Sequence, residues 1–160
     1  MYKNIFKSTD DIHEECGVFG IYGKSGINCA EIVYHALYAL QHRGQESCGI
    51  AVNNDNIITC HKELGLVGEV FDRELLNRME GNIAVGHVRY STTGSNTREN
   101  AQPLTSRYVK GSLTVVHNGN ISNAPELRQM LEETGAIFHS TNDTEIIACL
   151  LYTSPTSFST

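Results

Sequence analysis

Cys16-Gly17-Val18-Phe19-Gly20-Ile21-Tyr22-Gly23 is the stretch on which both the fold and the chemistry of this chain depend. Its apolar residues predict a first strand, and its glycines suit places where the backbone must approach something closely. If the polar leader 1–15 were removed, Cys16 would carry a thiol nucleophile and an α-amino group of pKa about 7.7 to 8.0 on one residue. The alternative is that Cys16 is a small buried hydrophobe.

Beyond this stretch, the apolar period predicts a mixed α+β chain without regular alternation of strands and helices. Apolar spacings of three and four indicate helices, and short apolar runs between turn residues indicate strands. A long polar loop is expected over 91–102. The predicted helices are 30–43 (with His42 and Arg43 in its last turn and Gly44 at its end), 70–79, one that begins after Asn123 and is closed by Gly135, and one whose capping box pairs Asn142 with Glu145. The predicted strands are 16–22, 49–52 and 57–60 (joined by a hairpin turn at 53–56), 83–90, 113–116 and 137–139.

Composition is typical of a soluble globular domain with a real core. The chain has 160 residues, of which 40% are hydrophobic and 19% charged. A net charge of −6 and scattered Lys and Arg argue against nucleic acid or an anionic membrane as partner. Residues 1–15 lack the apolar core of a signal peptide, and no stretch is long and apolar enough to cross a bilayer. We therefore expect a cytoplasmic protein.

The five cysteines indicate neither a disulfide framework nor a cysteine zinc site. Their number is odd, and no two of them form a C-x-x-C pair. We therefore expect reduced thiols. They are Cys16, Cys29, Cys48, Cys60 and Cys149.

Two arginine-containing segments each allow a structural and a chemical interpretation. The segment 41–47 is either a helix end with solvated charges, or it folds Arg43 back to brace a site. The segment 86–94 places Arg89 at the end of a predicted strand, before a loop rich in hydroxyl groups. There its planar guanidinium could grip a carboxylate in two places, or it could be a surface arginine beside a turn.

His117-Asn118-Gly119-Asn120 also allows two interpretations. Asn-Gly is the strongest short hairpin signal, so spacing alone favours a type I′ turn. The Asn118 side chain and the Gly119 N–H could instead form an oxyanion hole, with two donors aimed at developing negative charge. Asp143 suits the start of a helix, where a carboxylate faces the positive end of the dipole.

Taken in order, these segments closely resemble the glutaminase domain of the amidophosphoribosyltransferase family. The resemblance extends from Cys16 to about Tyr152, and it implies an α+β fold of the N-terminal-nucleophile hydrolase type, an αββα four-layer sandwich that is incomplete at its C-terminus. Other glutaminases of this class, such as glucosamine-6-phosphate synthase and asparagine synthetase, differ over 41–47 and 89–94. The matching stretches are 16–20, 41–47, 89–94, 117–120 and 143–145.

The resemblance gives each matched residue a role in the hydrolysis of glutamine. Cys16 would attack the side-chain amide and its freed α-amino group would move the proton, while Asn118 and Gly119 hold the oxyanion. Arg89 would pair with the α-carboxylate of the substrate and Asp143 with its α-ammonium. The implied supporting residues are Arg43, which orients the region around Cys16, and Tyr90 and Thr92 in a loop that closes over glutamine.

The resemblance further implies a larger enzyme. It divides the chain into a propeptide at 1–15, a partial glutaminase domain at 16–152, and a disordered tail or truncation end at 153–160. A phosphoribosyltransferase domain with no counterpart here would use the ammonia to make phosphoribosylamine from phosphoribosylpyrophosphate, the first step of purine synthesis. Magnesium and an iron–sulfur cluster are expected only with that domain, so no cofactor and no metal are expected within these residues. The full-length enzyme is expected to be a homo-oligomer.

Three functional alternatives follow from these observations. The chain is the glutaminase half of such an enzyme, the glutaminase domain of a related class II amidotransferase, or an inactive truncated or regulatory module. The intact set of candidate residues favours descent from an active enzyme. The tail at 153–160 predicts weak activity for the chain alone, because strands of the core would be missing.

Overall fold

Strands and helices follow one another irregularly in this chain, as the sequence predicts for an α+β protein. The computed structural model describes residues 16–24, 26–90 and 96–153. The expected propeptide, Thr92 and the tail beyond Thr153 lie outside the described residues. The elements are β1 (Gly17–Tyr22), α1 (Cys29–Ala39), the 3-10 turn η1 (Gln41–Arg43), β2 (Ser47–Asn54), β3 (Ile57–Leu64), α2 (Val67–Val70), α3 (Arg73–Arg78), β4 (Ile83–Arg89), the 3-10 turn η2 (Arg98–Asn100), β5 (Leu104–Tyr108), β6 (Gly111–Val115), α4 (Ala124–Glu133) and α5 (Thr144–Thr153).

The larger sheet has four antiparallel strands in the order β1-β4-β2-β3. The central strand β2 is buried over its first six residues, because both of its faces are covered. A two-residue turn joins β2 to β3, and its residues Asp55 and Asn56 have φ of 46° and 69°. Two left-handed residues define a type I′ turn, which short polar side chains tolerate. The predicted hairpin is therefore confirmed.

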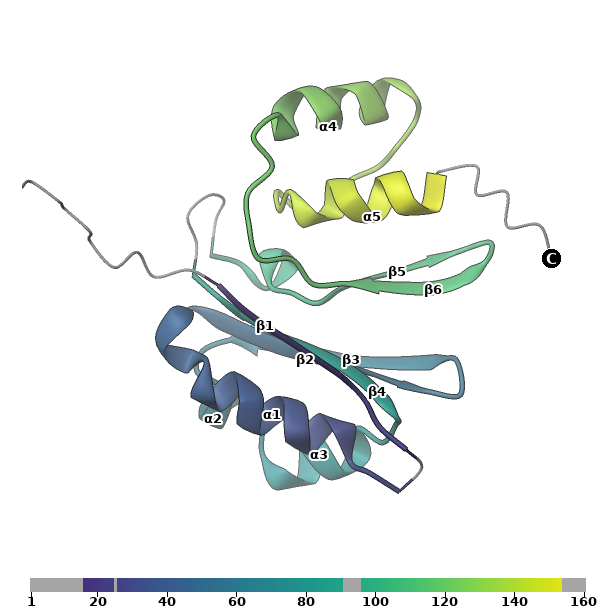
Figure 1. Cartoon of the computed structure of the whole chain (residues 1–160). Helices are drawn as coiled ribbons and strands as arrows, with labels where there is room; N and C mark the ends of the chain where they lie inside the picture. The colour runs from purple at the N-terminus through teal and green to yellow at the C-terminus, as the bar shows by residue number, and fades with distance from the viewer. Residues whose placement is uncertain (1–15, 25, 91–95, 154–160) are drawn as a thin grey trace, which may run out of the picture.

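Four layers are visible in Figure 1. Helices α1, α2 and α3 cover one face of the four-stranded sheet, and the β5–β6 hairpin lies on the other side. Helix α5 lies beyond this hairpin, and α4 packs outside α5. Two strands alone bury little surface, so the smaller sheet depends on the layers that cover it.

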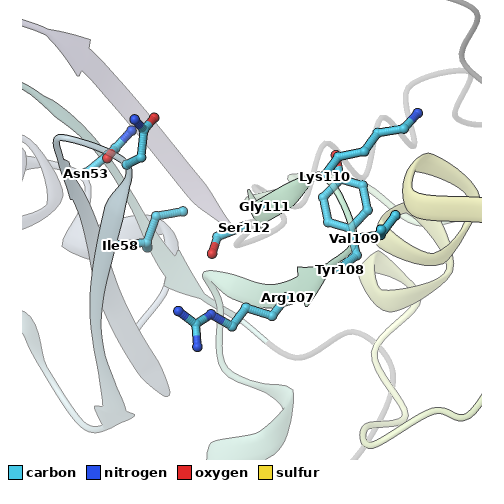
Figure 2. Close-up of a pocket in the computed structure, with 9 residues that line it drawn as sticks. Asn53, Ile58, Arg107, Tyr108, Val109, Lys110, Gly111 and Ser112 are labelled. Carbon is cyan, nitrogen blue, oxygen red and sulfur yellow. The ribbon is translucent and has the colours of Figure 1, made fainter.

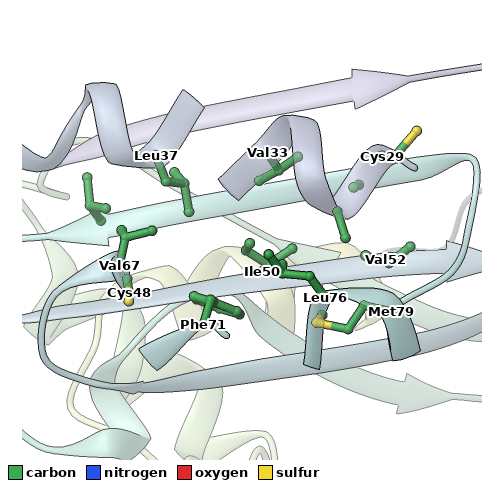
Figure 3. Packing of buried hydrophobic residues seen from close by; sticks show 13 residues of the cluster. Cys29, Val33, Leu37, Cys48, Ile50, Val52, Val67, Phe71, Leu76 and Met79 are labelled. Carbon is green, nitrogen blue, oxygen red and sulfur yellow. The ribbon is translucent and has the colours of Figure 1, made fainter. Parts of the chain in front are cut away.

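Two apolar clusters hold these layers together. The larger one lies between α1 and the four-stranded sheet, where Val33 and Leu37 meet Ile50 and Val52 of β2 (Figure 3). Helix α1 starts where the Asn28 side chain accepts a hydrogen bond from the Glu31 N–H at 3.2 Å. The smaller cluster is centred on α4 and α5, and its buried members are Leu131, Ile146 and Cys149.

The helix predicted over 70–79 is interrupted. Phe71 takes an extended conformation between α2 and α3, and its side chain is buried in the larger cluster. Asp72 then starts α3, because its carboxylate accepts a hydrogen bond from the Leu75 N–H at 2.7 Å. Burial of one aromatic ring thus divides an amphipathic stretch into two short helices.

The strand predicted over 137–139 is wrong. The N–H groups of His139 and Ser140 donate to the Glu145 carboxylate at 2.8 Å each instead of joining a ladder. Glu145 therefore does not complete a capping box with Asn142. The Asn142 side chain still accepts from the Thr144 N–H at 2.9 Å, at the start of α5.

Some other elements and boundaries also differ from the sequence prediction. Strand β5 was not expected, and η2 lies inside the predicted loop 91–102. Helix α1 ends at Ala39, so that Arg43 belongs to the separate turn η1. Helix α5 continues through Thr153, the first residue of the expected tail.

Candidate active site at the ends of β1 and β4

Cys16 lies at the start of β1, beside the end of β4. The antiparallel register pairs Gly17 with Val88, so Cys16 adjoins the last residues of β4. Its Sγ is 3.4 Å from both backbone polar atoms of Tyr90; the thiol donates to the carbonyl oxygen, and the N–H donates to sulfur. Cys16 is only half-buried. The thiol is therefore held in place by backbone groups rather than packed in the core.

The segment 41–47 folds back onto this strand end. Arg43 donates from Nε to the carbonyl oxygen of Cys16 at 3.2 Å. The Glu46 N–H donates to the carbonyl oxygen of Arg89 at 3.1 Å. Gly44 allows this approach, because a Cβ there would lie 2.7 Å from the backbone N and C of Arg89. Of the two interpretations of this segment, the one with Arg43 folded back agrees with these contacts.

The alternation of β4 turns Arg89 toward the second layer. A side chain on Gly86 would clash with Val33 of α1, and Val88 is part of the same core. His87 and Arg89 therefore point to the opposite face of the sheet. Arg89 is only 5% exposed, so the interpretation as a surface arginine is wrong.

Asn118 and Gly119 do not form a hairpin turn. They follow β6 and lead into α4, and both are exposed. Within the described residues, no hydrogen bond joins the Asn118 side chain to Cys16. The His117 carbonyl oxygen is 3.1 Å from Nε2 of His87, which ties this segment to β4. The link brings Asn118 and Gly119 to the face of the sheet on which Arg89 lies.

Asp143 precedes α5, as the sequence predicts, but its carboxylate binds another segment. Oδ2 accepts a hydrogen bond from the Ile121 N–H at 2.7 Å. Oδ1 is 4.0 Å from Nδ1 of His117, and the Asp143 side chain is 16% exposed. Asp143 therefore fastens the segment 117–121 to the start of α5 through Oδ2, whereas Oδ1 makes only the longer contact with His117.

Sequence reasoning missed two buried residues beside these groups. Gln102 accepts a hydrogen bond from the His117 N–H at 2.7 Å and donates to the His117 carbonyl oxygen at 3.2 Å. His87 is fully buried, and this burial lowers its pKa to about 4. His87 belongs to the segment 86–94, and Gln102 ends the predicted polar loop 91–102. Burial of a polar side chain cannot be predicted from local sequence.

Thiol reactivity should separate Cys16 from Cys48 and Cys60. Burial raises the pKa of Cys48 to about 12 and raises that of Cys60, so at pH 8 both stay protonated and unreactive. We expect iodoacetamide at pH 8 to alkylate Cys16 in the native protein and to spare Cys48 and Cys60. Peptide mass mapping reads the sites, with urea-denatured protein as the control in which all thiols react. Native alkylation of Cys48 would contradict this expectation.

A polar pocket of about 560 Å³ lies elsewhere, between the β2–β3 and β5–β6 hairpins. Figure 2 shows Arg107 reaching from β5 toward Asn53 and Ile58. None of the candidate site residues that the sequence predicts lines this pocket. The remaining lining residues are Asn56, Tyr108, Val109, Lys110, Gly111 and Ser112.

Across 16–24, 26–90 and 96–153, no three His, Cys, Asp or Glu side chains gather in a way that could hold a metal ion. All five cysteines have free thiols. In the same ranges, no helix is both long and apolar enough to span a membrane.

Comparison with known proteins gives consistent similarities. A family model described as a glutamine amidotransferase domain matches residues 72–155. The amidophosphoribosyltransferase of Methanothermobacter thermautotrophicus is 49% identical over 144 residues, which are 88% of this chain and 30% of that protein. A chloroplastic amidophosphoribosyltransferase of Arabidopsis thaliana is 49% identical over 139 residues, or 86% of this chain and 24% of that protein.

Solved structures agree with these relatives. An allosteric regulatory enzyme of purine biosynthesis superposes with a TM-score of 0.80 and 45% identity, over 87% of this chain and 30% of that one. Glutamine phosphoribosylpyrophosphate amidotransferase from B. subtilis, complexed with ADP and GMP, gives 0.78 and 44%, with the same coverage. This chain thus spans about 30% of the length of these two proteins.

Proposed function

The chain belongs to the glutamine amidotransferase family, as the N-terminal glutamine amidotransferase domain of amidophosphoribosyltransferase, and on this premise we propose that it hydrolyses glutamine to glutamate and ammonia with Cys16 as the nucleophile. The observation that carries this proposal is the position of Cys16 at a strand end, with its thiol bound to the Tyr90 backbone and its carbonyl bound by Arg43. The Cys16 thiol is half-buried, and the buried Arg89 lies at the end of the neighbouring strand β4. Such a pair of residues suits attack on a zwitterionic substrate.

The chemistry is acyl transfer in two stages. Sγ of Cys16 forms a bond to the side-chain carbonyl carbon of glutamine, and the α-amino group exposed by removal of the leader takes the thiol proton. That proton passes to the amide nitrogen as the carbon–nitrogen bond breaks, and ammonia leaves. Water then attacks the thioester and gives a proton to the same α-amino group, which passes it to sulfur as the carbon–sulfur bond breaks, and glutamate departs. The Asn118 side chain and the Gly119 N–H hold the oxyanion in both stages.

Two charged residues would bind the ends of the substrate. Arg89 pairs with the α-carboxylate, because its guanidinium is buried on the face that the Asn118 segment approaches. Asp143 pairs with the α-ammonium through Oδ1, since Oδ2 already holds the Ile121 N–H. Arg43 holds the Cys16 backbone in place through its bond to the Cys16 carbonyl oxygen. Tyr90 and Thr92 would belong to a loop that closes over glutamine.

The larger activity is proposed from the relatives. In a full-length enzyme, a phosphoribosyltransferase domain would use the ammonia to convert phosphoribosylpyrophosphate to phosphoribosylamine, in the first step of purine synthesis. We assign the fold to the N-terminal-nucleophile hydrolase class, which the layer order in Figure 1 supports. A homo-oligomer and a cytoplasmic location stay predictions, and one similar relative is chloroplastic.

Release of glutamate from glutamine by the purified chain tests the proposal. We expect turnover only after cleavage between Glu15 and Cys16, because the α-amino group is the base. Intact-mass measurement or N-terminal sequencing reports the cleavage, and a coupled glutamate assay reports the turnover. Turnover by protein that retains Met1 would overturn the role of the α-amino group. A cleaved and folded protein without turnover would favour an inactive or regulatory module.

A further inference from the structure

We infer that Gln102 and His87 are positioning residues that fix the His117 peptide, so that Asn118 and Gly119 are held ready to receive the oxyanion. This inference rests on the proposed function. Neither side chain has been given a role above in binding or chemistry. Both come from segments that precede the Asn-Gly pair in the chain, on β4 and before β5.

The contacts form a three-point clamp on a single residue. Gln102 pairs with His117 through both of its amide atoms, as acceptor from the N–H at 2.7 Å and as donor to the carbonyl oxygen at 3.2 Å. Nε2 of His87 binds the same carbonyl oxygen at 3.1 Å. Gln102 is 4% exposed and His87 is fully buried, so water does not compete for these bonds.

Clamping this carbonyl sets the direction of the segment that follows. The His117 carbonyl and the Asn118 N–H belong to one planar peptide group, so fixing the oxygen fixes the plane from which Asn118 starts. The Gly119 N–H, the proposed oxyanion donor, is only one peptide further on. Gly119 itself has φ of 152° and a Cβ there would lie 2.9 Å from Nε2 of His117, so the backbone path is tightly restricted.

The chemistry of His87 suits a permanent donor. Nε2 must carry the proton in order to donate to a carbonyl oxygen, which leaves Nδ1 as the unprotonated nitrogen. Nδ1 is buried without a hydrogen-bond partner, and a second proton there would bring an unpaired charge into the interior. The imidazole therefore stays neutral and keeps one orientation. A positioning role needs such a fixed donor, whereas a proton-transfer role would need access to substrate.

Paired variants in the cleaved chain test the clamp. His87→Gln keeps an N–H donor near the position of Nε2, whereas His87→Leu removes this donor. Gln102→Met removes both hydrogen bonds to His117 while keeping a side chain of similar size. We expect His87→Leu and Gln102→Met to lower kcat about 10- to 100-fold with KM within about threefold, because misplaced oxyanion donors act on the transition state. His87→Gln should recover most of the loss. Alkylation of Cys16 by iodoacetamide should not change.

Hydrogen exchange provides a readout that does not depend on activity. Amides of 116–121 should exchange about tenfold faster in Gln102→Met than in the parent protein, because their anchor is lost. Val52→Ala, a core change in β2 under α1, is the control that lowers stability without touching His117. Unchanged exchange over 116–121 would overturn the clamp, as would unchanged kcat in an active protein. A parent protein that exchanges as expected but releases no glutamate would overturn the proposed function alone.

Discussion

Cys16→Ala should abolish glutamine hydrolysis, with a loss of at least about 10⁴-fold in kcat. The proposed acyl transfer has no other route, since the thiol forms the bond to the substrate carbon and the other four cysteines are more buried or lie away from this strand end. Steady-state release of glutamate by the cleaved protein measures the effect. Removal of the small Cys16 side chain breaks only its bonds to Tyr90, so the variant should remain folded.

Cys60→Ala is the matched control for this prediction. Cys60 is also partly buried, but its thiol faces the Pro103 carbonyl oxygen at 3.9 Å rather than the strand end. We expect Cys60→Ala to keep kcat within about twofold, because surface and peripheral changes rarely act on the transition state. Residual turnover by Cys16→Ala above the background of the uncatalysed reaction would contradict the role of Cys16.

Arg89→Gln should lower kcat/KM about 100-fold or more, mainly through a higher KM. Arg89 is 5% exposed, and loss of one partner from a buried charge pair costs about 2 to 5 kcal/mol. The same residue type at an exposed position provides the control: Arg78→Gln on α3 breaks only a surface pair with Glu74 at 3.8 Å and should leave turnover unchanged.

A modified substrate separates loss of binding from loss of folding. Glutamine with its α-carboxylate converted to an amide has no anion for Arg89 to bind. The parent protein should turn this analogue over poorly, and Arg89→Gln should give nearly the same low rate, since the interaction is already absent. If Arg89→Gln still distinguished glutamine from the analogue as well as the parent does, Arg89 would not be the carboxylate partner.

Local signals predicted most of the fold. The hairpin turn at Asp55 and Asn56 depends on residues that tolerate left-handed backbone, so its type follows from the sequence. Helix α1 and strands β1 and β4 have clear apolar periods. The helix predicted over 70–79 is confirmed at 73–78 but interrupted before it, because Phe71 is extended and buried in the core. The strand predicted over 137–139 is wrong, because Glu145 binds the N–H groups of His139 and Ser140. Both differences are tertiary effects on short segments.

The candidate site was predicted in part. Motifs named Cys16, Arg89 and Asp143, and the structure shows the contacts of Cys16 and Asp143 and the burial of Arg89. Motifs could not show that Asp143 already binds the Ile121 N–H, because this bond joins two segments far apart in the chain. The roles of the buried polar residues Gln102 and His87 could not be predicted for the same reason, because their partner is the backbone of His117, elsewhere in the chain.

The pairing of β1 with β4 has a consequence for the order of folding. Cys16 and Tyr90 are 74 residues apart in the chain, whereas β2 and β3 are joined by a two-residue turn. Closing a long loop costs more entropy than closing a hairpin, so contacts of high sequence separation form slowly. The hairpin can therefore form early, while the thiol reaches the end of β4 only as the sheet is completed. A partly folded chain would carry the cysteine without the contacts that orient it, which delays the onset of catalysis until the domain has folded.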